Sequence, residues 1–151
     1  MPNPRSTVAI GDHPLYAMLV PVPFVCFLVT FFTDWTYAET ANMQWANMSA
    51  WMLTAGLVVS IPTVIVGLID FLREPRIRAF PAAWIHAIGY AIILVLSIFN
   101  AFVHSRDAYT SVVPMGLTLS AIVAVIVLVT AWTGGTLVYR HRVGVAPEDR
   151  P

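Results

Sequence analysis

Residues 81–104 read PAAWIHAIGYAIILVLSIFNAFVH, and this stretch decides how the chain folds. It holds no arginine and no carboxylate along its whole length. A helix needs roughly 20 apolar residues to cross the hydrocarbon core of a bilayer, and only helices or closed barrels satisfy every backbone polar group there. The strict alternation of apolar and polar residues in barrel strands is absent. The stretch therefore predicts a transmembrane helix.

Three other stretches have the same character, at residues 14–33, 48–70 and 112–139. The composition agrees, because 58% of all residues are hydrophobic and only 11% are charged, against about 45–50% and about 25% in soluble domains. We therefore expect a single all-α domain over residues 1–151, a bundle of four transmembrane helices with up-down topology.

The connections between these helices are expected at residues 34–47, 73–78 and 106–111. Proline inside a span removes a backbone hydrogen bond, so Pro21 and Pro23 predict a break in the first helix.

The arginines predict the orientation of the bundle. Cytoplasmic loops of membrane proteins carry an excess of basic residues. One expected face holds only Arg106, whereas the other holds Arg5, Arg73, Arg76, Arg78, Arg140, Arg142 and Arg150. The arginine-rich face should be cytoplasmic, with both termini on that side of a bacterial inner membrane. The alternative for the first stretch is a cleavable signal peptide that starts at Arg5.

Polar and small residues recur at helical spacing on three of the stretches, and such groups should face the bundle interior because lipid offers them no partner. On the third helix they are His86, Tyr90, Ile93, Ser97, Asn100 and His104. On the second they are Gly56, Ser60, Thr63, Gly67 and Asp70, and on the fourth Gly116, Ser120, Ala124, Ala131 and Gly135.

The expected depths sort the ionisable residues into two groups at opposite ends of the bundle. His13, Asp70 and His86 belong to the arginine-rich end. Asp34, Asn100, His104 and Arg106 belong to the other end. The sequence therefore predicts two buried polar clusters, one near each membrane face.

Several short motifs occur along the chain in a characteristic order. They are His13-Pro14 followed by Pro21, then Gly67-Leu68-Ile69-Asp70, His86, Gly134-Gly135-Thr136-Leu137-Val138-Tyr139 and Val143-Gly144-Val145. In these motifs the chain resembles the bacterial membrane family called domain of unknown function 2231. The resemblance covers nearly the whole chain and implies a four-span membrane domain. It implies no activity and no catalytic residues.

The first functional hypothesis is a haem b or metal site with His13 and His86 as ligands and Asp70 orienting one imidazole. Neutral imidazole is a common ligand of both groups, and helical bundles hold such sites between facing helices. The competing interpretation is a structural hydrogen bond between Asp70 and one of the two histidines.

Two further hypotheses stay open. A proton or solute relay would run along His86, Ser97, Asn100 and His104, with Asp70 and Asp34 at its mouths. Alternatively the chain is a non-catalytic subunit or assembly protein that forms a homodimer, or binds a membrane partner, through small-residue faces.

Other classes of function have little support. The net charge of zero does not suggest nucleic-acid binding, and the lipid bilayer is the expected surrounding. No phosphate loop, nucleophile elbow or HExxH zinc helix is present. The lone Cys26 has no histidine at its expected depth, so a thiol nucleophile is not expected. The sequence therefore argues against an enzyme.

Overall fold

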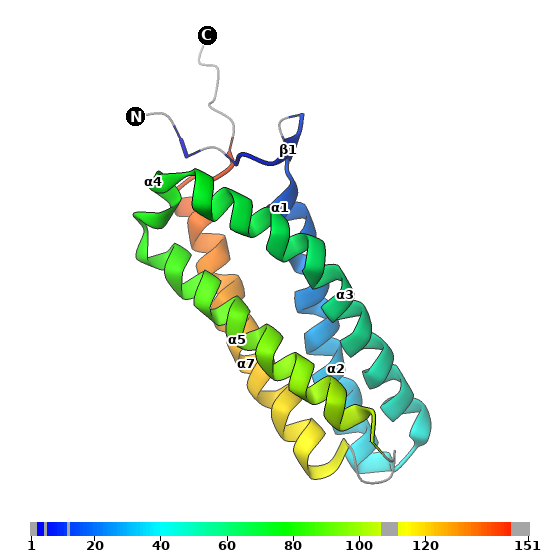
Figure 1. Cartoon of the computed structure of the whole chain (residues 1–151). Coiled ribbons are helices and arrows are strands. Elements are labelled where there is room, and N and C mark those ends of the chain that lie inside the picture. Colours follow the sequence, from blue (N-terminus) through cyan, green and yellow to red (C-terminus); the bar gives the residue numbers. More distant parts are fainter. Residues whose placement is uncertain (1–2, 5, 12, 107–111, 146–151) are drawn as a thin grey trace.

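The structure, a computed structural model, describes residues 3–4, 6–11, 13–106 and 112–145. Long helices lie side by side in an elongated bundle, and successive ones run in opposite directions (Figure 1). Within these residues, four spans are long and apolar enough to cross a membrane, Leu15–Thr40, Met43–Arg73, Pro81–His104 and Val112–Tyr139. Helices α2 (Pro21–Thr40), α3 (Met43–Arg73), α5 (Pro81–His104) and α7 (Leu117–Gly135) make up most of these spans.

The first span is built from α1 (Leu15–Leu19) and α2, with Val20 between them. The predicted break is confirmed, because α1 ends at Leu19 and a new helix begins at Pro21, which has no backbone N–H to donate to α1. Val20 keeps helical dihedral angles, with φ −59° and ψ −30°. The two pieces therefore still count as one continuous crossing.

The connection predicted at residues 34–47 is wrong, because only Ala41 and Asn42 separate α2 from α3. Asp34 does not end the span, since its side chain is fully buried inside the bundle. Ala41 turns the chain with φ 53°, and the Asn42 side chain accepts a hydrogen bond from the Gln44 N–H at 3.0 Å. An asparagine cap of this kind starts a helix without a long loop.

The remaining connections are short. Helix α4 (Pro75–Arg78) makes the charged turn between α3 and α5. The last span begins with the π-helix η1 (Val112–Gly116), and its final residues belong to a second π-helix, η2 (Thr136–Arg140). The predicted bounds 81–104 and 112–139 coincide with the third and fourth spans. Residues 107–111 of the predicted third loop lie outside the described part of the chain.

The first described residues fold back over one end of the bundle, which the sequence did not predict. Strands β1 (Ala9–Ile10) and β2 (His13–Pro14) pair antiparallel. The Gly144 N–H donates to the Pro4 carbonyl oxygen at 2.9 Å, so the first and last described segments meet at the same end.

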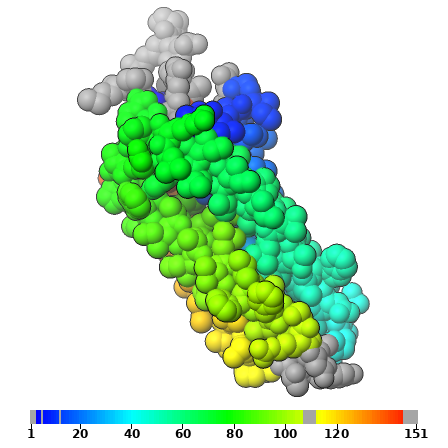
Figure 2. Space-filling model, in the orientation of Figure 1, coloured from blue at the N-terminus to red at the C-terminus, as the bar shows by residue number. Residues whose placement is uncertain are grey.

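The middle of the bundle is apolar. Its core is formed by Phe24, Phe27, Leu53, Tyr90, Ile93, Val123 and Val127. Helix α2 packs against α3 and α7, and α5 packs against the same two helices, so α2 and α5 lie diagonally opposite each other. Side chains of α3 and α5 close the face shown in Figure 2. Many large apolar side chains point outward, as a lipid solvent requires.

The predicted inward faces of α3 and α5 are confirmed by burial, since the predicted residues Ser60, Thr63, Ser97 and Asn100 are all buried. The predicted face of α7 is wrong at its second half. Ala131 is exposed, and the buried line continues through Val127 and Thr130 instead.

Candidate functional site

His86 lies near the arginine-rich end and has a hydrogen-bond partner at each ring nitrogen. Its Nδ1 is 2.8 Å from the Thr130 carbonyl oxygen, and its Nε2 is 2.7 Å from the Tyr16 hydroxyl. A carbonyl oxygen can only accept, so Nδ1–H donates to it, and in the neutral ring Nε2 accepts from the tyrosine O–H. We call His86, Tyr16 and Thr130 the His86 cluster.

Two glycines make room for this cluster. A Cβ at Gly134 would lie 2.9 Å from His86 Cε1, and a Cβ at Gly67 would lie 2.5 Å from Tyr16 Cε2. Contacts under 3.0 Å essentially never occur for real Cβ atoms. The rings of His86 and Tyr16 therefore rest directly on the backbones of α7 and α3. These glycines belong to the motifs noted in the sequence, and close packing explains both.

Asp70 does not pair with either histidine, so the predicted hydrogen bond between Asp70 and an imidazole is wrong. Its Oδ1 accepts from the Thr7 N–H at 2.6 Å, the Thr7 hydroxyl at 2.7 Å and the Val8 N–H at 3.1 Å. Its Oδ2 accepts from the Ser6 hydroxyl at 2.6 Å. Asp70 therefore fastens the N-terminal segment across the end of α3.

The residues at this end do not fit the predicted haem or metal site. The Nε2 lone pair of His86 already accepts a hydrogen bond from Tyr16. His13 is exposed and lies in β2, before the first helix begins. Within the described part of the chain, no group of three or more His, Cys, Asp or Glu side chains could hold a metal ion.

A second polar cluster lies at the opposite end, where the structure brings together three of the four residues that the sequence grouped, Asp34, Asn100 and His104. His104 Nε2 is 2.9 Å from Asp34 Oδ1, with 3% of the histidine side chain and none of the aspartate side chain exposed. His104 Nδ1 is 3.0 Å from the Asn100 backbone oxygen and 3.1 Å from Asn100 Oδ1. We call Asp34, Asn100 and His104 the His104 cluster.

The hydrogen bonds fix how many protons the His104 cluster holds. Because the Asn100 backbone oxygen only accepts, Nδ1 carries a proton. One further proton must lie between Nε2 and Asp34 Oδ1. The pair is therefore either imidazolium with carboxylate or imidazole with carboxylic acid. Both arrangements are neutral overall, and they differ only in the position of one proton along a 2.9 Å bond.

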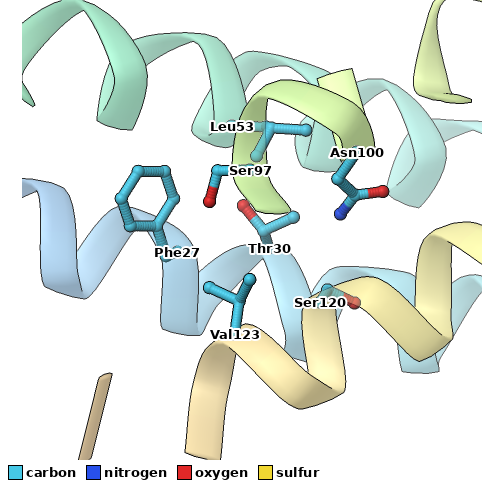
Figure 3. Close-up of a pocket in the computed structure, with 7 residues that line it drawn as sticks. All are labelled: Phe27, Thr30, Leu53, Ser97, Asn100, Ser120 and Val123. Atoms are coloured by element: carbon cyan, nitrogen blue, oxygen red, sulfur yellow. The ribbon is translucent and has the colours of Figure 1, made fainter. Parts of the chain in front are cut away.

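Two buried oxygens of this region have no hydrogen-bond partner among the described residues, Asp34 Oδ2 and Ser97 Oγ. Ser97 faces a narrow gap where all four spans meet (Figure 3). The gap is too narrow to hold a water molecule. Its lining consists of Phe27, Thr30, Leu53, Ser97, Asn100, Ser120 and Val123.

An apolar layer separates the two polar clusters. Tyr90 donates to Ser60 Oγ at 3.0 Å, and the apolar Phe24 ring packs against both Tyr90 and His86, with centroids 5.4 Å and 6.3 Å away. Ile93 is fully buried between Tyr90 and Ser97 on α5. The predicted relay from His86 to His104 is thus interrupted by hydrocarbon at two points.

The partners of the clusters were only partly predictable. His86, Asp34, Asn100 and His104 stood out as polar residues in apolar stretches. Tyr16 and Thr130 did not, because a tyrosine near a span end and a helix carbonyl give no special pattern. Arg106 lies two residues after the end of α5 and is exposed, so it is not part of the His104 cluster.

Together the outward apolar surface, the spans and the buried polar clusters define a multi-pass helical membrane protein in contact with lipid. Comparison with known proteins agrees. A family model described as "Predicted membrane protein (DUF2231)" matches residues 12–147. The chain belongs to this family, as the sequence motifs predicted. No curated protein and no solved structure matches the chain.

Proposed function

We propose that this chain is a non-catalytic membrane protein that binds and releases a proton at the His104 cluster and so responds to pH at one membrane face. The observation that carries the proposal is the fully buried Asp34 carboxyl, hydrogen-bonded to His104 through one oxygen only. Ionisable residues inside membrane spans are expensive and commonly functional. A well-packed hydrophobic pair in place of Asp34 and His104 would stabilise the bundle at least as much as the buried ionisable pair does.

The position of the pair gives proton binding a mechanical consequence. Asp34 belongs to α2 and His104 to α5, two helices that lie diagonally opposite each other. Loss of the shared proton leaves a buried carboxylate beside a neutral imidazole, and gain of a proton leaves a buried cation. Either change places an uncompensated charge in the bundle. The diagonal contact should therefore weaken on both sides of a pH optimum.

The charged groups around the pair are few. Among the described residues at this end they are Glu39 and Arg106, both exposed. Neither substitutes for the partner of Asp34 or His104. We also propose that the arginine-rich end faces the cytoplasm of a bacterial cell. The His104 cluster would then respond to the pH outside the inner membrane.

Proton binding can be measured directly on the full chain reconstituted in lipid nanodiscs. After a pH jump, an indicator dye should report proton uptake by the unmodified chain that is lost in both Asp34→Asn and His104→Gln. His141→Gln is the matched control, because His141 stacks on Phe80 at the other end. Uptake that is unchanged in Asp34→Asn, or that disappears in His141→Gln, would refute the proposal.

The other hypotheses have less support. A haem or metal ligand at His86 would first have to displace Tyr16 from Nε2. A visible spectrum without a Soret band in the purified protein would remove the haem hypothesis.

A relay across the membrane would have to pass Phe24 and Ile93. Proton flux into vesicles above the level of empty vesicles, and dependent on His104, would favour it over local binding.

A further inference from the structure

Several arginines gather at the arginine-rich end, and most of those that the structure describes there have no carboxylate partner among the described residues. Among the described residues, the arginines there without an ion pair are Arg73, Arg78, Arg140 and Arg142. Of the two carboxylates that the structure describes at the same end, Asp70 binds the N-terminal segment and Glu74 pairs with Arg76 at 2.9 Å. The hydrogen bond from Arg76 lowers the pKa of Glu74, so this pair stays ionised.

A ring contact brings three of these arginines together. Phe80 and His141 stack with centroids 4.0 Å apart and planes 23° apart. Arg78 lies two residues before Phe80, and Arg140 and Arg142 flank His141. Since two residues of chain span at most about 7 Å, the backbone of each of these arginines lies within that distance of a stacked ring residue. The α4 turn and the end of η2 therefore lie next to each other at this end of the bundle (Figure 1), which brings the chain positions of Arg78, Arg140 and Arg142 into one region.

Aromatic residues indicate the depth of this region in the membrane. Trp84 donates its Nε1–H to the Arg78 carbonyl oxygen at 3.0 Å and is 49% exposed, and Tyr139 is 87% exposed. Exposed tryptophan and tyrosine at span ends lie at the level of the lipid headgroups. The arginines beside them should lie at the same level.

We infer that Arg78, Arg140 and Arg142 form a binding surface for the phosphate of an anionic phospholipid. The guanidinium group binds phosphate oxygens through two parallel N–H donors. Basic clusters next to span ends recognise anionic lipids in this way. The opposite end offers only Arg106 among the described arginines, so the surface is specific to one leaflet.

The test uses the full chain in a neutral detergent, with the thermal unfolding midpoint followed during titration with phosphatidylglycerol or phosphatidylcholine. Phosphatidylglycerol should raise the midpoint and phosphatidylcholine should not. In Arg140→Gln/Arg142→Gln the apparent affinity should fall by roughly tenfold or more, equivalent to at least about 1.4 kcal/mol. Arg106→Gln is the matched control and should bind like the unmodified chain.

Three results would overturn the inference. The first is an equal response to both lipids. The second is an equal loss of affinity in Arg106→Gln. The third is a shift from saturating inorganic phosphate alone that equals the shift from phosphatidylglycerol and leaves no further effect of the lipid, which would indicate a free-anion site. If the double variant does not fold, Arg78→Gln alone tests the same surface through a smaller loss.

Discussion

The His86 cluster and the His104 cluster connect the first span to α5 across the same diagonal, yet they differ in chemistry. In the first, a neutral ring is held by a tyrosine and a backbone carbonyl, with glycine backbones pressed against it. In the second, a histidine faces a carboxyl that has one unpartnered oxygen. In the His86 cluster, close packing and two hydrogen bonds hold the neutral ring, so this arrangement needs no charge. The second depends on where a proton sits.

The largest expected effect comes from breaking the charged pair. His104→Leu leaves the Asp34 carboxylate buried and alone, which should lower the free energy of unfolding by about 3–5 kcal/mol at neutral pH. The double variant Asp34→Leu/His104→Leu should recover most of the loss, because no charge is left uncompensated. Unfolding in detergent measures both. A double variant as unstable as His104→Leu would show that the pair contributes by packing alone.

The next effect tests the shape of the His86 cluster with adjacent glycines. Gly134→Ala places a methyl group 2.9 Å from His86 Cε1, whereas at Gly135 the nearest atom outside the helix backbone is Tyr139 Cδ2 at 3.9 Å. Overpacking of this kind costs about 1–3 kcal/mol. Gly134→Ala should therefore lower the unfolding midpoint, and Gly135→Ala should leave it almost unchanged. Equal effects of the two variants would contradict the close packing.

These two variants also mark what the sequence could predict. The spacing on α5 identified His86, Asn100 and His104 as inward-facing, since periodicity follows from helix geometry alone. On the fourth helix the spacing predicted Gly135 as inward-facing, whereas Gly134 is the glycine that packs against His86, because the rotation of α7 depends on its neighbours. Asp34 was expected to end the first span, since a carboxylate in hydrocarbon is costly without a partner. That partner, His104, lies 70 residues away.

A smaller effect should follow from removing one hydroxyl. Tyr16→Phe takes away the donor to His86 Nε2 without changing the ring, so stability should fall by about 1 kcal/mol. Tyr139→Phe is the control, because that side chain is 87% exposed. The Tyr16→Phe cost should not depend on pH near neutrality, in contrast to His104→Leu. A strong pH dependence at Tyr16 would remove the distinction between the clusters.

The smallest effect is expected outside both clusters, at Glu74. The hydrogen bond from Arg76 lowers the pKa of Glu74. The contribution of the Glu74 carboxylate to folding stability is therefore present above its unfolded-state pKa and is lost as the pH falls through its folded-state pKa. Arg76 is half-exposed and solvent screens the pair. Glu74→Gln should therefore be indistinguishable from the unmodified chain at neutral pH. A loss as large as that of Tyr16→Phe would contradict this account.

The most direct test of the proton site is a pH titration of the histidine ring nitrogens by ¹⁵N magnetic resonance on the chain in lipid bilayers. The account predicts that His86 keeps a protonated Nδ1 and an unprotonated Nε2 across the accessible pH range. It predicts that the His104 signals change with pH and that Asp34→Asn shifts this titration while leaving His86 unaffected. A His104 titration that is indifferent to Asp34, or that matches the titration of His141, would contradict it.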